Sequence, residues 1–114
     1  MMDRLIELLG WEATERLVLY YGAARLYVPT RGASADVRRV LGDEASEALH
    51  REFAGERIDV PSHAALVRRS AVRYATGQLR RGAPIRRVAA ETGLSRRHVA
   101  RLAQVEIDDL DRSG

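Results

Sequence analysis

A short segment of the chain occurs twice at a constant spacing of 32 residues. Residues 25–30 read Arg-Leu-Tyr-Val-Pro-Thr, and residues 57–62 read Arg-Ile-Asp-Val-Pro-Ser. Three positions are identical, two more hold chemically close pairs, and Tyr21 matches Phe53 at the same spacing. Alternating apolar side chains predict a strand in each copy, and the proline ends it because proline donates no hydrogen bond to a neighbouring strand. The repeat therefore predicts a helix-to-strand unit used twice.

Helices are predicted around these strands by apolar residues that recur at spacings of three and four, as one buried stripe requires. The predicted helices are 3–9, 11–22, one that Ser34 caps and that runs through Leu41, one that Asp43 caps and that runs to Phe53, and a longer one over 63–80. Gly10, Gly22 and Gly42 separate them. The fold class expected is mainly α with a short two-strand β-ribbon.

Residues 1–62 are expected to be a dimerisation region. Two strands of about four residues form only a marginal sheet by themselves. A segment of this size with few aromatic side chains also buries little apolar surface. Pairing one strand edge with a second copy of the chain would supply what is missing, so we expect a homodimer joined through this half.

Charge divides the chain into three blocks. Residues 1–62 hold eight arginines and eleven acidic residues, a net charge of −3, whereas residues 63–104 hold ten arginines and only Glu91, a net charge of +9. Residues 105–114 hold four acids and Arg112, again −3. A block as basic as the second is typical of a region that faces a polyanion. The acidic tail is read first as a solvated segment, with a polymerase contact or an internal mimic of DNA as alternatives.

Residues 85–104 have the pattern of two helices joined by a tight turn. Ala89 is the small residue needed where two helices cross, Gly93 can take the positive φ of the turn, and Ser95 can cap the second helix. The apolar anchors are Val88, Leu94, Val99 and Leu102. Thr92 departs from the pattern, because its place usually holds a more apolar side chain. Together with the helix over 63–80, these segments predict a three-helix helix-turn-helix DNA-binding domain.

The outer face of the second helix carries the candidate DNA-reading residues. A recognition helix presents its N-terminal side chains to the major groove, where arginine binds guanine edges or neutralises phosphates. An αα-hairpin with a solvated arginine face is the alternative. The residues assigned to DNA are Ser95, Arg96, Arg97, His98 and Arg101, with Arg68, Arg73, Arg86 and Arg87 as further contacts.

Other chemistry has no support in the sequence. The chain has no cysteine, so disulfides, thiolate metal sites and cysteine nucleophiles are excluded. The three histidines lack metal-ligand spacing, and there is no glycine-rich phosphate loop or nucleophile elbow. We therefore expect no enzyme, cofactor or metal. No apolar run is long enough to cross a bilayer, and the first residues lack the basic and long apolar regions of a signal peptide, so we expect no membrane partner and a cytoplasmic protein.

Several stretches together resemble the Mor family of phage and prophage transcription activators. They are Tyr-Gly-x-x-Arg-Leu-Tyr-Val-Pro at 21–29, Gly-Glu-Arg-Ile-Asp-Val-Pro at 55–61, the arginine-rich helix with Gly82, and Val-Ala-Ala-Glu-Thr-Gly-Leu-Ser-Arg-Arg-His-Val at 88–99. The resemblance covers about residues 15–104. It departs from the family where Ala23 and Ala24 stand in place of one or both glycines before the first strand.

The resemblance implies a homodimer, joined through helices and a short strand, on a dyad-symmetric site of double-stranded DNA beside a middle or late phage promoter. It also implies recruitment of the host RNA polymerase. With it, Arg96, Arg97 and Arg101 fall on the DNA-reading helix and Leu26 to Val28 in the dimerisation strand. The residues expected to join the two copies are Leu17, Tyr21, Leu26, Tyr27, Val28, Ile58 and Val60.

The function expected is therefore a dimeric, sequence-specific transcription activator. Its expected parts are a dimerisation region (1–62), a helix-turn-helix domain (63–104) and an acidic tail (105–114). A repressor or an excision-type architectural protein is the alternative within DNA binding. An antitoxin-like module, whose residues 1–62 bind a protein partner, is the alternative from another class.

Overall fold

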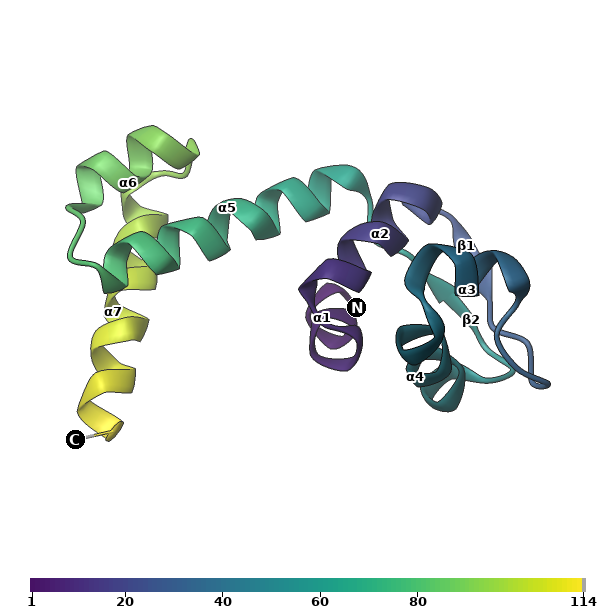
Figure 1. Ribbon diagram of the computed structural model, residues 1–114. Coiled ribbons are helices and arrows are strands. Elements are labelled where there is room, and N and C mark those ends of the chain that lie inside the picture. Colours follow the sequence, from purple (N-terminus) through teal and green to yellow (C-terminus); the bar gives the residue numbers. More distant parts are fainter. Residues whose placement is uncertain (114) are drawn as a thin grey trace. The chain divides into compact units, whose positions relative to one another are not determined.

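The chain is mainly helical, with one small antiparallel sheet (Figure 1). The structure, a computed structural model, describes the backbone of residues 1–113 and the side chains of residues 1–109. Within this range the elements are α1 (Met2–Leu9), α2 (Trp11–Tyr21), β1 (Arg25–Tyr27), α3 (Ala35–Leu41), α4 (Asp43–Phe53), β2 (Arg57–Asp59), α5 (His63–Arg80), α6 (Ile85–Thr92) and α7 (Arg96–Ser113). The predicted mainly helical class with a two-strand ribbon is confirmed.

The residues group into two compact units, the first over Met1–Leu66 and the second from Val67 onward. Helix α5 contributes to both, because it begins at His63 and its Leu66 packs against the core of the first unit. Within residues 1–113 no helix combines the length and the apolar character that a membrane span requires.

The first unit packs four helices and the ribbon around one core. Strands β1 and β2 pair antiparallel, with Leu26 opposite Ile58 and Arg25 opposite Asp59. Their buried and exposed side chains alternate because successive side chains of a strand point to opposite faces. The buried core residues are Leu5, Ala13, Leu17, Val18, Val28, Val37, Leu41, Leu49, Phe53, Ile58 and Val60. The two predicted strands thus pair with each other within one chain, as the predicted ribbon requires.

Of the two N-caps predicted in the first unit, Ser34 is present and Asp43 is wrong, and Ser62 caps α5. Ser34 Oγ accepts a hydrogen bond from the backbone N–H of Val37 at 3.2 Å, and Ser62 Oγ accepts one from Ala65 at 3.1 Å. Asp43 is the first residue of α4 rather than its N-cap. Gly42 is both the C-cap of α3 and the N-cap of α4. Its φ is 84°, which glycine adopts without steric cost.

The second unit is a three-helix arrangement with a small core. Its buried residues are Ala75 on α5, Val88 and Ala89 on α6, and Val99 on α7. Half-buried apolar side chains complete it, namely Leu79, Ala83, Leu94 and Leu102. Helix α7 continues to Ser113, so the acidic residues after 104 extend the same helix rather than forming a separate tail.

Candidate nucleic-acid interface

The turn between α6 and α7 is built from three residues with distinct tasks. Gly93 is left-handed, at φ 76° and ψ 0°, and its N–H donates to the carbonyl of Ala89 at 3.0 Å. Leu94 is half-buried against the core of the unit. Ser95 Oγ accepts a hydrogen bond from the backbone N–H of His98 at 3.0 Å, which satisfies a donor in the first turn of α7.

Thr92, the residue that departs from the sequence pattern, is accommodated by two hydrogen bonds. Its hydroxyl donates to the carbonyl of Val88 at 2.7 Å and accepts from the N–H of Leu94 at 3.3 Å. The half-buried polar side chain is therefore satisfied, and the second bond helps to hold the turn.

Close packing fixes α7 against α6. Val88 and Val99 are completely buried, and Ala89 is 9% exposed. These are the residues that the sequence assigned to the crossing and to the anchors. A larger side chain at Ala89 would push the two helices apart, because a close-packed interior has no spare volume there.

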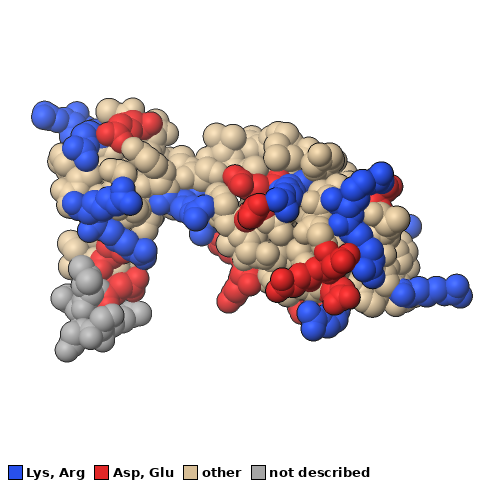
Figure 2. Space-filling view, viewed as in Figure 1, with Lys and Arg blue, Asp and Glu red and all other residues tan. Residues whose placement is uncertain are grey.

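The first two turns of α7 expose a row of arginines. Arg96, Arg97 and Arg101 are exposed, as is Ser95, whereas His98 is half-buried. Among the described side chains, no ion pair involves these three arginines. In the view of Figure 2, several arginine side chains project from the surface of the second unit.

The charges along α7 run against its dipole. The N-terminal end of a helix is partially positive and the C-terminal end partially negative, so cations are unfavourable in the first turn and acids in the last. Arginines occupy the start of α7, and Glu106, Asp108 and Asp109 follow from its middle onward. The unpaired arginines and the helix dipole repel each other at this end, and an anion bound there would offset that repulsion.

The remaining arginines assigned to DNA differ in their surroundings. Arg68, Arg73, Arg86 and Arg87 are all exposed. Arg87 Nε lies 3.3 Å from Glu91 Oε1, so its charge is partly matched. Arg86, its neighbour on α6, forms no ion pair among the described side chains. Arg86 is therefore the less compensated of the two.

Glu91 also joins α6 to α5. The Tyr74 hydroxyl donates a 2.6 Å hydrogen bond to Glu91 Oε2. This hydrogen bond, with some burial and the negative charge of Glu91, raises the pKa of Tyr74 above its usual value near 10. One acidic residue thus binds a side chain from each of two helices.

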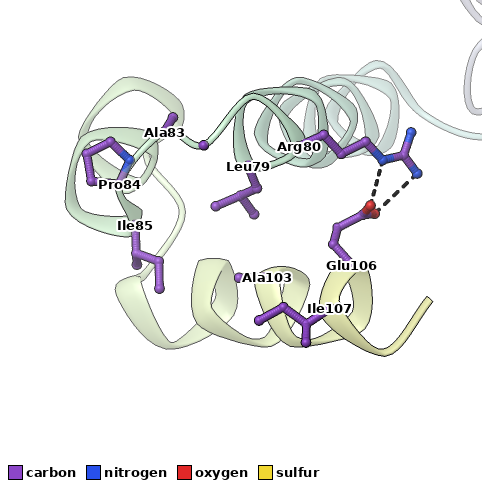
Figure 3. A pocket seen from close by; sticks show the side chains of 9 residues that line it. Leu79, Arg80, Ala83, Pro84, Ile85, Ala103, Glu106 and Ile107 are labelled. Carbon is purple, nitrogen blue, oxygen red and sulfur yellow. Dashed lines mark hydrogen bonds and ion pairs between the residues drawn. The ribbon is translucent and has the colours of Figure 1, made fainter. Parts of the chain in front are cut away.

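An open apolar pocket, which the sequence did not predict, lies where α5, α6 and the second half of α7 meet (Figure 3). Its volume is about 660 Å³. Leu79, Ile85 and Ile107 point into it, and the ion pair of Arg80 with Glu106 lies at one side, with Nε and Oε2 2.6 Å apart. Glu106 raises the pKa of Arg80 through this hydrogen bond and its charge. Side chains far apart in sequence line the pocket, so no local pattern marks it.

The residues predicted to join two copies lie mostly inside the first unit. Leu17, Val28, Ile58 and Val60 are at most 3% exposed, in the core of a single chain. Tyr21 and Leu26 are half-buried against the same core, and Tyr27 is 51% exposed. The structure brings these residues together in or against the core of the first unit of a single chain.

No metal site is present among the described residues, since no three His, Asp or Glu side chains gather within reach of one ion. Comparisons of the chain with protein families, with curated proteins and with solved structures found no match.

Proposed function

We propose that this protein binds double-stranded DNA sequence-specifically and regulates transcription. One observation carries the proposal: exposed arginines without a carboxylate partner stand on the first two turns of α7, immediately after a tight glycine turn and a serine cap. In a helix-turn-helix the second helix lies in the major groove with its N-terminal residues at the base edges, and the first helix crosses the backbone.

Each part of the second unit then has a task in binding. Arg96, Arg97 and Arg101 face the major groove, where arginine forms bidentate hydrogen bonds with guanine. Arg86 on α6 faces the phosphates that flank the groove. The helix that carries the reading residues is held by Val88 and Val99, so the arginines start from a fixed backbone.

The sign of regulation that we propose is activation. The resemblance of residues 15–104 to the Mor family supports it, and with it a contact with the host RNA polymerase. The acidic second half of α7 bears Glu106, Asp108 and Asp109, which phosphates would repel. That half of the helix is therefore suited to face away from DNA.

Selection from a random pool of double-stranded DNA with the full chain tests the binding. We expect enrichment of one consensus sequence, and loss of that enrichment in an Arg97→Ala/Arg101→Ala variant. An Arg51→Ala variant, which removes an exposed arginine of the first unit, is the control and should select the same consensus. Recovery of no consensus by the folded wild-type protein contradicts the proposal.

Transcription in vitro from a promoter that bears the selected sequence tests the sign. An activator raises the amount of transcript in the presence of the host polymerase, in proportion to occupancy of the site. A fall in transcript at full occupancy would instead identify a repressor.

A further inference from the structure

The whole first unit repeats itself at the spacing of 32 residues. Helix α2 spans Trp11–Tyr21 and strand β1 spans Arg25–Tyr27. When 32 is added to these residue numbers, the results are the first and last residues of α4 and β2. Helices α1 and α3 end at Leu9 and Leu41, again 32 residues apart. The duplication thus extends over the helices, where Glu12, Ala13, Glu15 and Leu17 recur as Glu44, Ala45, Glu47 and Leu49.

Backbone conformations repeat as well. Gly10 lies at φ 87° and ψ 163°, and Gly42 at φ 84° and ψ 167°. Ala23 and Gly55, again 32 residues apart, both have a positive φ, 64° and 82°. Ala23 is the only non-glycine residue with a positive φ within the described chain. Equivalent positions share unusual conformations even where the side chain differs.

The hydrogen bonds between the two halves come in exchanged pairs. Val28 N–H donates to the carbonyl of Glu56, and Val60 N–H donates to that of Ala24, each at 2.9 Å. Likewise Gly55 N–H donates to Val28, and Ala23 N–H donates to Val60. A shift of 32 turns each bond into the other, and Leu26, the centre of the strand pair, lies opposite its own equivalent, Ile58. The first unit therefore has an internal twofold relation.

Burial follows the same relation. In several pairs of residues 32 apart, both members are buried or half-buried. These pairs are Leu5 and Val37, Thr14 and Ser46, Leu17 and Leu49, Tyr21 and Phe53, Leu26 and Ile58, and Val28 and Val60. Both repeats contribute matched side chains to one shared core. A twofold arrangement of identical contacts is what a symmetric dimer of two chains presents.

We infer that the first unit is a symmetric dimer contained within one chain, and that the protein recognises DNA as a monomer. The repeats of residues 1–30 and 33–62 occupy the two places that two chains would fill. Helices α5 to α7 follow the second repeat and have no counterpart after the first. The first unit, with its two equivalent repeats, is therefore joined to a single DNA-reading helix, α7. The inference that this helix reads one half-site, without dyad symmetry, rests on the proposed function.

The reason for expecting a homodimer is met inside the chain. That expectation came from a ribbon and a core that are marginal by themselves, and the helices of both repeats pack with the ribbon around one shared core. Each strand has only three residues, and the exposed positions include Arg25, Arg57 and Asp59. Very short strands with charged side chains are poor templates for pairing with a further chain.

Measurement of mass and of DNA stoichiometry tests the inference on the full chain. Sedimentation equilibrium at micromolar concentrations should give 12.7 kDa, the mass of one chain. Selected DNA should contain a single motif without an inverted copy, and one chain should bind each DNA. Twice that mass for the free protein, or two chains on a dyad-symmetric site, overturns the inference.

A cysteine pair distinguishes strand pairing within a chain from an exchange of repeats between two chains. The natural chain has no cysteine, and Arg25 and Asp59 lie directly opposite each other on paired strands, with Nε and Oδ1 3.1 Å apart. Opposed residues of antiparallel strands are within disulfide reach. An Arg25→Cys/Asp59→Cys variant should oxidise to a cross-linked monomer on a non-reducing gel, and a covalent dimer would overturn the inference. Neither the mass of the free protein nor the gel requires DNA, so a failure of the proposed function is seen separately, as the absence of DNA binding.

Discussion

Ala23 and Gly55 occupy equivalent places before the two strands, and both adopt a positive φ, 64° for Ala23 and 82° for Gly55. Each donates its N–H to the opposite strand's end, Ala23 to Val60 and Gly55 to Val28. The left-handed region costs a residue with a Cβ about 1–2 kcal/mol more than it costs glycine. Ala23 therefore retains strain that Gly55 avoids.

Replacing Ala23 with glycine should stabilise the protein. Glycine removes the backbone strain, but it also raises the conformational entropy of the unfolded chain, which opposes folding. Because the strain energy is the larger of the two, we expect a gain of about 0.5–1 kcal/mol in the free energy of unfolding. For a unit of this size this is a rise in Tm of a few degrees. Thermal unfolding followed by circular dichroism measures it. Ala24→Gly is the matched control, because Ala24 has no positive φ, and it should not raise Tm.

The reverse change at the equivalent position should destabilise the protein. In Gly55→Ala the new Cβ would lie 3.1 Å from Thr30 Cγ2. The alanine would also have to adopt the φ of 82° that Gly55 has. We expect a loss of about 1–2 kcal/mol on urea unfolding. A Gly55→Ala variant as stable as the wild type would show that this turn is not held in the left-handed conformation.

The Tyr74–Glu91 hydrogen bond predicts a pH dependence. A raised pKa in the folded state means that the neutral phenol is favoured there, so its contribution to stability is complete below the usual pKa near 10 and is lost as the pH rises through the folded-state value. In Glu91→Ala the titration of Tyr74, followed by NMR of its ring carbons, should shift to lower pH. Glu106→Ala removes a carboxylate that does not contact Tyr74 and should leave the midpoint in place. An unchanged midpoint in Glu91→Ala would contradict the contact.

Much of the fold could be predicted from the sequence because its signals are local. Apolar spacing located the helices, Pro29 and Pro61 marked the strand ends, and the pattern around Ala89 and Gly93 located the tight turn between α6 and α7. Each of these depends on residues within one or two turns of one another, and propensity and capping act over that distance.

What the sequence could not predict depends on partners far along the chain. The sequence predicted a two-strand ribbon, but it did not predict which side chains of the two repeats would meet in one shared core. The pocket beside Leu79 and Ile107 joins three helices, so no spacing reveals it. Thr92 departs from the apolar pattern, and only the bonds of its hydroxyl to Val88 and Leu94 show how it fits.

Arg86 should contribute to the salt dependence of DNA binding. Each phosphate neutralised by an arginine releases about 0.9 counterions, so Arg86→Ala should lower the slope of log affinity against log salt by about one per bound chain. The loss should be similar for all sequences, since phosphates carry no sequence information. Fluorescence anisotropy at a series of salt concentrations measures the slope. Arg51→Ala, in the first unit, should not change it, and an unchanged slope in Arg86→Ala would exclude a phosphate contact.

Arg97 and Arg101 should read bases. They lie four residues apart, so they share one face of α7, and both are exposed in its first two turns. A bidentate arginine–guanine pair discriminates against the wrong base by about 1–3 kcal/mol. Arg97→Ala should therefore weaken binding to the selected site by roughly ten- to a hundredfold, with little effect on non-specific DNA.

A panel of single-base variants of the selected site separates base reading from charge. If Arg97 contacts one base pair, Arg97→Ala should bind the wild-type site and the variants at that position with nearly equal affinity, and it should keep its preference elsewhere. Arg101→Ala should lose preference at a neighbouring position, because its side chain is one helical turn further along α7. Arg86→Ala is the charge-matched control, since it removes the same positive charge and should retain preference at every position. Uniform weakening by both Arg97→Ala and Arg101→Ala, with preference kept throughout the site, would show that these arginines only neutralise phosphates and that specificity comes from the shape of the DNA.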